Sequence, residues 1–189
     1  MIYYYLVRIK EKISDRLSTA ICRVKAKLWN VSLGKCSSFS GVTIFRRYPG
    51  SIISIGKGCV FNSSMHSNQI GIFSQCMIST LNSDACIVIG DNCGFSGTVI
   101  SSATSITIGN NVRCGANTLI TDTDFHTDDP RAGKNSPVVI EDNVWLGYGV
   151  KILKGVRIGN GAMVGAGSIV TKDIPANTIA AGIPCKIIK

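Results

Sequence analysis

The residue best suited to acid–base chemistry in this chain is His126, one of its two histidines. It lies in a polar stretch, residues 121–139, that also contains Asp122 and Asp124. An imidazole titrates near neutral pH, so a histidine held beside a hydroxyl group can remove its proton. His126 is therefore a candidate general base, and the alternative is a solvated loop histidine. The second histidine, His66, lies in no recognisable motif and is interpreted as structural.

A six-residue repeat surrounds this stretch and predicts the architecture. An aliphatic residue recurs at every sixth position, and a small or β-branched residue stands four places after each one. The lead residues are Ile140, Leu146, Ile152, Ile158, Val164 and Val170. This period is typical of a hexapeptide β-helix, in which three hexads form one triangular coil. The predicted fold is all-β, a left-handed parallel β-helix, with the hand inferred from the repeat type.

The repeat can be followed back through Ile108 and Ile89 to Ile55, which allows roughly six coils of ~18 residues. After Ile120 the next lead residue should be residue 126, but the pattern resumes only at Ile140. The intervening residues predict one long loop that projects from a coil corner, and long loops in compact domains are often functional. The expected organisation is a helical segment over residues 1–34, the β-helix over 35–175 with its loop at 121–139, and a C-terminal tail over 176–189.

Residues 1–28 predict an amphipathic helix, because apolar residues recur three and four apart and no Gly or Pro occurs before Gly34. More than half of the formal net charge of +9 lies in this segment. We favour a helix packed on the β-helix or on a neighbouring subunit; the alternative is peripheral contact with an anionic membrane surface. The apolar run at the N-terminus is too short for an export signal, which predicts a cytoplasmic protein, alternatively one at the inner face of the membrane.

Composition argues against several other classes. The eight cysteines lack C-x-x-C spacing and predict small buried thiols in a reducing compartment, with no zinc or other metal site. Nucleic-acid binding is not expected, because the basic residues are not interleaved with aromatic residues that could stack on bases. A zinc-dependent β-helical carbonic anhydrase needs three histidines, and the chain has two.

Three stretches resemble hexapeptide-repeat O-acetyltransferases of the sugar, maltose and galactoside type, including those that modify polysaccharide units. They are residues 140–147 (IEDNVWLG), 164–175 (VGAGSIVTKDIP) and 181–186 (AGIPCK). The resemblance is close over about residues 85–189 and loose over 40–84. It implies a homotrimer with acetyl-CoA in the groove between two β-helices, and acetyl transfer to a hydroxyl of a sugar or glycan precursor.

The same resemblance implies the roles of individual residues. His126 falls in the loop that bears the family's general base, and the backbone N–H of Tyr148 falls at the position of the oxyanion donor. Many relatives have Ser at this second position, so Tyr148 keeps only the backbone donor. The implied acetyl-CoA-binding residues are Trp145, Gly147, Gly165, Ala166, Thr171, Lys172 and Lys186. Trp145 could equally be an interface aromatic. Lys186 stands where relatives often have Arg; the lysine keeps the positive charge but lacks the planar guanidinium group.

The acceptor side is less clearly marked. Ser96 stands where sugar-specific relatives place a polar acceptor-binding residue, although Phe95 departs from their pattern. Asp124 is the nearest carboxylate that could orient His126, but Asp residues in short loops are also common turn formers. Three other functions remain open: an amino-sugar N-acetyltransferase, a serine O-acetyltransferase of the same fold, and a non-catalytic β-helical scaffold.

Overall fold

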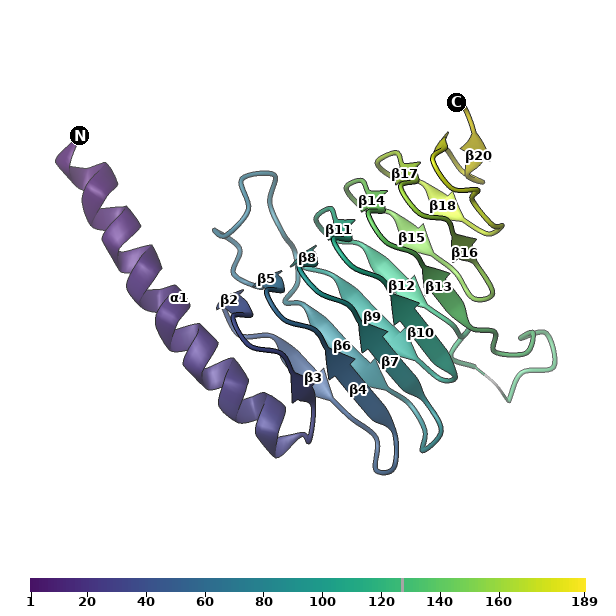
Figure 1. Cartoon of the computed structure of the whole chain (residues 1–189), viewed down its shortest axis with the longest axis horizontal. Helices are drawn as coiled ribbons and strands as arrows, with labels where there is room; N and C mark the ends of the chain where they lie inside the picture. The colour runs from purple at the N-terminus through teal and green to yellow at the C-terminus, as the bar shows by residue number, and fades with distance from the viewer. Residues whose placement is uncertain (127) are drawn as a thin grey trace.

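The structure, a computed structural model, describes residues 1–126 and 128–189; Thr127, which belongs to the predicted loop, lies outside the described residues. One long helix, α1 (Ile2–Leu28), crosses the end of a stack of short strands (Figure 1). The strands form three sheets, and the chain visits sheets 1, 2 and 3 in turn. The predicted stack of parallel strands with an N-terminal helix is confirmed.

Each sheet is built from the strands that successive coils contribute, and sheet 2 also contains the antiparallel strand β20. Sheet 1 contains β1 (Ser32–Leu33), β4 (Ile52–Ile55), β7 (Cys86–Ile89), β10 (Ser105–Ile108), β13 (Val138–Ile140) and β16 (Arg157–Ile158). Sheet 2 contains β2 (Ser38–Ser40), β5 (Val60–Asn62), β8 (Gly94–Ser96), β11 (Arg113–Cys114), β14 (Trp145–Leu146), β17 (Met163–Val164), β19 (Ile179–Ala181) and β20 (Lys186–Ile187). Sheet 3 contains β3 (Ile44–Arg46), β6 (Met77–Thr80), β9 (Val99–Ser102), β12 (Leu119–Thr121), β15 (Lys151–Ile152) and β18 (Ile169–Val170). The turns between the sheets form three edges of a prism, named edge 1–2, edge 2–3 and edge 3–1.

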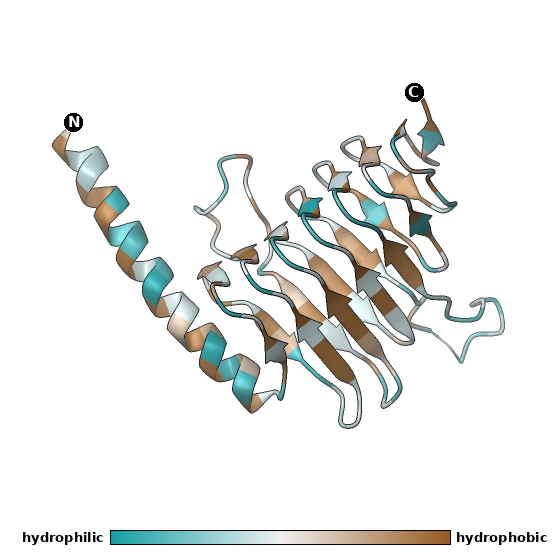
Figure 2. Ribbon diagram, viewed as in Figure 1, coloured by the Kyte–Doolittle hydropathy of each residue, from teal (hydrophilic) through white to brown (hydrophobic). Residues whose placement is uncertain are grey.

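The hexapeptide prediction holds at the level of single residues. All six lead residues named above are 0% exposed, and they point into the coil. Ile140 pairs with Ile158 and Leu146 pairs with Val164, so one coil takes 18 residues in this part of the chain. Parallel neighbours are therefore successive coils, and the core is a column of buried apolar side chains. Figure 2 shows the hydrophobic strands that contribute to it in brown.

The long insertion is also confirmed. Ile108 of β10 pairs directly with Ile140 of β13, and the residues between β12 and β13 leave the stack at edge 3–1 (Figure 1). A second loop, residues 63–76 between β5 and β6, was not predicted. The interpretation of residues 121–139 as the only polar excursion is therefore wrong. His66 lies in the second loop and is exposed, so its interpretation as a structural residue has no support from burial.

Helix α1 packs on the β-helix, as predicted, but through an unexpected face. Its buried residues are Ser18, Cys22 and Ala26, which are small and lie on one side of the helix. The apolar stripe that predicted the helix faces away from the coil and is exposed. The physical reason is the shape of the contact, because small side chains let the helix backbone approach the first coil closely.

Side chains of α1 occupy the open backbone edge of the first coil. The Phe39 N–H of β2 donates to Thr19 Oγ1 at 3.0 Å, and the Thr43 N–H donates to Cys22 Sγ at 3.3 Å. Arg23 donates to the Ser37 carbonyl oxygen at 3.2 Å. These groups would otherwise lack a neighbouring strand, so α1 acts as a cap.

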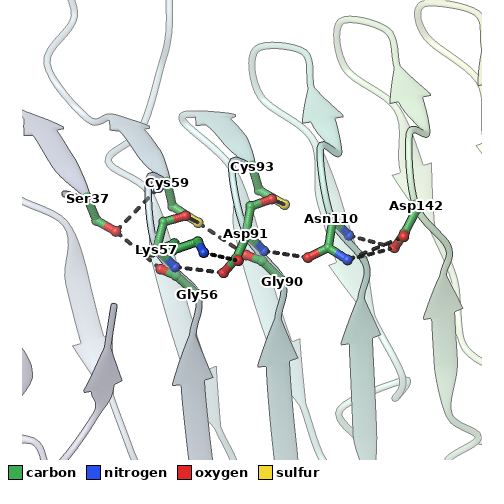
Figure 3. Close-up of polar contacts among 9 residues, drawn as sticks. All are labelled: Ser37, Gly56, Lys57, Cys59, Gly90, Asp91, Cys93, Asn110 and Asp142. Carbon is green, nitrogen blue, oxygen red and sulfur yellow. Dashed lines mark hydrogen bonds and ion pairs between the residues drawn. The ribbon is translucent and has the colours of Figure 1, made fainter. Parts of the chain in front are cut away.

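A ladder of short polar side chains holds edge 1–2 together (Figure 3). The backbone N–H of Lys57 donates to Asp91 Oδ1 at 2.9 Å, the N–H of Asp91 donates to Asn110 Oδ1 at 2.9 Å, and the N–H of Asn110 donates to Asp142 Oδ1 at 2.7 Å. Each coil thus provides an acceptor for a turn N–H of the preceding coil. The turns therefore repeat the same hydrogen bond from coil to coil, as the core repeats its apolar residues.

All eight cysteines are free, as predicted. Five are buried, and burial raises the pKa of the Cys76 and Cys114 thiols, which keeps them protonated and unreactive. Cys36 is exposed, so the prediction that the cysteines are buried is wrong at this position. It adopts a left-handed backbone conformation (φ 61°) in the turn between β1 and β2, where the side chain points outward.

Candidate active site

His126 lies on the loop at edge 3–1, and its side chain is exposed. The residue before it, Phe125, has φ 68°, a conformation that an aromatic residue rarely adopts. The Phe125 N–H donates to Thr123 Oγ1 at 3.0 Å, which holds the backbone in this conformation. Backbone strain that the surrounding structure maintains is common beside reactive groups. The His126 side chain thus leaves the coil from a fixed, strained turn.

The base of this loop is buried, although the whole stretch was expected to project from a coil corner. Asp122 is 0% exposed, and its carboxylate accepts four hydrogen bonds from the preceding coil. The donors are the backbone N–H groups of Ala103 (2.6 Å) and Thr104 (2.8 Å) and the hydroxyls of Ser102 (2.7 Å) and Thr104 (2.8 Å). A carboxylate with this many donors is satisfied without water, which explains why a charged residue can lie there.

A second anchor reaches the loop from the following coil. Lys154, only 20% exposed, donates to Asp124 Oδ2 at 2.6 Å and to the Gly133 carbonyl oxygen at 2.8 Å. Asp124 therefore gives one carboxylate oxygen to Lys154, and a role of Asp124 in orienting His126 stays a prediction. Sequence reasoning missed Lys154, because a lysine in a coil turn carries no signal of the loop that it contacts.

Most of the small residues predicted to contact acetyl-CoA lie together at edge 2–3. Gly147 and Tyr148 follow β14, and Gly165 and Ala166 follow β17 one coil later. The Tyr148 N–H donates to no acceptor within residues 1–126 and 128–189, whereas its carbonyl oxygen accepts from Gly167 at 2.7 Å. An N–H that donates to no acceptor among the described residues can bind a developing oxyanion.

Coil stacking explains part of the requirement for glycine at this edge. A Cβ added to Gly147 would lie 2.6 Å from the Ala166 nitrogen and 2.9 Å from its Cα. A Cβ added to Gly165 would lie 2.8 Å from the Ala181 Cβ. The small residues therefore allow successive coils to approach one another, whether or not a ligand also lies there.

We expect Gly147→Ala to destabilise the protein by about 1–3 kcal/mol, because backbone atoms of the next coil cannot move aside cheaply. Thermal unfolding monitored by circular dichroism measures the effect. Gly94→Ala is the matched control, since a Cβ at Gly94 meets nothing within 4 Å. Equal unfolding midpoints for the two variants would show that stacking does not restrict Gly147.

Ser96, the candidate acceptor-binding residue, is buried at the end of β8 on the same edge. Its hydroxyl oxygen accepts from Asn62 Nδ2 and from Asn68 Nδ2, each at 3.1 Å. Asn68 belongs to the second loop, which Asn117 also holds by accepting from the Phe73 N–H at 2.9 Å. The second loop thus covers Ser96 in the single chain, and sequence reasoning missed Asn68 because the loop itself was not predicted.

The remaining candidates lie on the surface. Trp145 is 54% exposed on the outer face of sheet 2, and Lys186 is exposed on β20 of the same sheet. Thr171 and Lys172 are exposed at edge 3–1, after β18. Among the described residues, no group of three or more His, Cys, Asp or Glu side chains could hold a metal ion.

One chain therefore divides the candidate site between two edges. Ser96, Tyr148 and the small residues lie at edge 2–3, whereas His126, Thr171 and Lys172 lie at edge 3–1. Sheet 3 separates these edges, so the single chain does not bring His126 to the Tyr148 N–H. A concavity of about 660 Å³ lies elsewhere, between the N-terminal half of α1 and the second loop.

Comparison with known proteins agrees with this architecture. Residues 137–172 match the bacterial transferase hexapeptide (six repeats) family. A galactoside O-acetyltransferase of Lactococcus lactis is 51% identical over 89 residues, which cover 44% of this chain and 42% of that protein. A 2,3,4,5-tetrahydropyridine-2,6-dicarboxylate N-acetyltransferase of Staphylococcus aureus is 59% identical over 54 residues, which cover 29% of this chain and 23% of that protein.

A solved structure extends the likeness to nearly the whole fold. It is a variant of AntD, an N-acyltransferase from Bacillus cereus, in complex with dTDP-4-amino-4,6-dideoxyglucose and coenzyme A. The TM-score is 0.67 at 22% identity, over 88% of this chain and 87% of that chain. The chain spans less than half the length of the two curated relatives described above. Residues 137–172 thus match the bacterial transferase hexapeptide family, and the resemblance to hexapeptide-repeat acetyltransferases that the sequence indicates is confirmed.

Proposed function

We propose that this chain is a left-handed β-helix that transfers an acetyl group from acetyl-CoA to a hydroxyl of a sugar or glycan precursor. The observation that carries the proposal is the loop at edge 3–1, where a strained Phe125 and two anchors hold His126 outside the coil. Irregular, strained structure is costly in a regular repeat, and its presence directly beside His126 favours a catalytic role for this histidine. The two curated relatives described above are named as acetyltransferases.

The chemistry needs one base and one oxyanion donor. His126 removes the proton of the acceptor hydroxyl as its oxygen attacks the thioester carbon. The Tyr148 N–H donates to the oxyanion of the tetrahedral intermediate. Collapse of this intermediate breaks the C–S bond, and the leaving thiolate accepts the proton that the His126 imidazolium holds. The products are the acetyl ester and free coenzyme A.

Release of free thiol from acetyl-CoA in the presence of a panel of sugars and nucleotide sugars tests the proposal. Acceptor-dependent thiol release supports it, and its absence with every hydroxyl and amine acceptor favours the scaffold alternative. Mild alkali then distinguishes O-acetylation from N-acetylation, because it cleaves an acetyl ester and leaves an acetamide intact. An alkali-stable product would replace the O-acetyltransferase proposal by an N-acetyltransferase.

We expect a homotrimer, because a complete site needs edge 3–1 of one copy beside edge 2–3 of another. Light scattering should give three times the chain mass of 20.1 kDa. A closed ring of three copies forms three equivalent sites. An active monomer would contradict both the assembly and the division of the site between copies.

The double variant Lys172→Ala/Lys186→Ala should raise the Michaelis constant for acetyl-CoA about 10- to 100-fold, with a much smaller change for the acceptor. Both lysines are exposed and are proposed to face the phosphates of the coenzyme, and charge-assisted contacts of this kind contribute about 1–3 kcal/mol in total. The difference should shrink at high salt, which already screens the wild-type contacts. Unchanged affinity for acetyl-CoA at low salt would remove both lysines from the proposed site and leave the fold intact.

A further inference from the structure

Helix α1 presents a continuous apolar surface on the side opposite its contact with the coil. This outer stripe consists of Ile2, Leu6, Ile9, Ile13, Leu17, Ile21, Val24 and Leu28, which are between 37% and 79% exposed. At 3.6 residues per turn, the centre of the stripe lies about 180° from the buried side chains of Ser18, Cys22 and Ala26. The stripe runs the length of the helix, about 40 Å. Soluble proteins rarely leave an apolar surface of this length without a partner.

The exposed charges on α1 are all basic. Every basic residue of the helix is exposed: Arg8, Lys10, Lys12, Arg16, Arg23, Lys25 and Lys27. Its two acidic residues, Glu11 and Asp15, are half-buried on the side that faces the coil, and Glu11 accepts from Arg8 at 2.9 Å. The accessible surface of the helix is therefore apolar and positive, and Figure 2 shows the alternation of brown and teal along it.

These charges decide between the candidate partners. A second copy would present the same basic residues, so pairing of two stripes would bring like charges together. Insertion across a bilayer does not fit either, because within the part of the chain that the structure describes no helix combines sufficient length with the apolar character of a membrane span. An anionic lipid surface satisfies both features, since acyl chains accept the stripe and headgroups attract the flanking cations.

We propose that the outer stripe of α1 and its basic flanks bind the surface of an anionic lipid bilayer, with the helix lying in the plane of the interface. The apolar side chains enter the boundary between headgroups and acyl chains to a depth of about 5–10 Å. The inner face of α1 keeps its contacts with the first coil, because none of the stripe residues is buried there. Binding therefore requires no rearrangement of the β-helix, and it is independent of the proposed acetyl transfer.

Co-sedimentation of the full chain with vesicles tests the proposal. The chain should bind vesicles of phosphatidylglycerol and phosphatidylcholine at least ~10-fold more tightly than vesicles of phosphatidylcholine alone, and the difference should fall as salt rises. The variant Ile9→Gln/Ile13→Gln/Leu17→Gln should lose at least ~10-fold in affinity and keep its unfolding midpoint, because these side chains are exposed.

A matched control removes three exposed apolar residues outside the helix, in Ile52→Gln/Ile70→Gln/Phe73→Gln, and should bind anionic vesicles like the wild type. The proposal is overturned if the wild type does not bind anionic vesicles, or if the stripe variant binds them as tightly as the control does. It is also overturned if the stripe variant has a smaller mass than the wild type in lipid-free light scattering, since the stripe would then cover another copy of the chain.

Discussion

Replacement of His126 by Ala should lower the rate of acetyl transfer by roughly 100- to 10,000-fold, the usual contribution of a general base. The loss should appear in kcat and in kcat/KM for the acceptor, because the imidazole acts on the hydroxyl proton. Binding of acetyl-CoA, measured by calorimetry, should be unchanged, since the proposed coenzyme contacts lie on other residues. Steady-state kinetics with saturating acetyl-CoA gives the comparison directly.

His66→Ala is the control for this variant. His66 is exposed in the second loop and belongs to no part of the proposed site, so its replacement should leave the rate within a few-fold of the wild type. A His126→Ala protein that turned over at the wild-type rate would remove the proposed mechanism. Equal losses in both variants would point to a general effect of histidine replacement on the protein.

Asp122→Ala should destabilise the protein by about 3–5 kcal/mol, because it leaves the buried N–H of Ala103 and the partly buried N–H of Thr104 without an acceptor. For a chain of this size, the expected fall in unfolding midpoint is roughly 10 °C. The loop should also open at its base. Limited trypsin digestion, followed by mass spectrometry, should therefore show faster cleavage after Arg131 and Lys134, which are exposed in the same loop.

Asp128→Ala provides the comparison within the same loop. Asp128 is exposed, so its removal should change the unfolding midpoint and the rate of loop cleavage only slightly. If the two aspartate variants behave alike, the carboxylate of Asp122 does not anchor the loop. If the Asp122→Ala variant has a lower unfolding midpoint but is cleaved in the loop at the wild-type rate, Asp122 stabilises the coil without fixing the position of the loop.

The regular part of the structure could be predicted from the sequence because each coil repeats the same physical requirement. Leu146 and Val164 occupy equivalent places, and each must be apolar for the same reason, so the period itself carries the information. The 14-residue delay before Ile140 was visible because it interrupts a strong pattern. The second loop was not visible, since the repeat around residues 62–88 is weak and an insertion there leaves no clear gap.

Contacts that depend on the third dimension could not be predicted. Asp122 and Asp124 are two residues apart and chemically identical, yet one is fully buried against the preceding coil and the other pairs with Lys154. The packing of helix α1 could not be predicted either. Periodicity indicated its apolar stripe, whereas the small residues Ser18 and Ala26 contact the first coil. A packing face made of small side chains has a weak hydrophobic signal, and a sequence pattern ranks it below the larger stripe.

The cap at the first coil has a consequence for how copies of this protein can assemble. An open strand edge is a template on which another molecule can add its own strands, and stacked coils would then grow end to end into fibres. Thr19 and Cys22 occupy the N–H groups that such growth would use, and β20 runs antiparallel to β19 at the other end of sheet 2. Axial growth is therefore blocked at these positions, and the long sides of the prism are left for contacts between copies. Lateral contacts whose rotation closes form rings of fixed size, so a helix that blocks axial growth is compatible with the finite homotrimer proposed above.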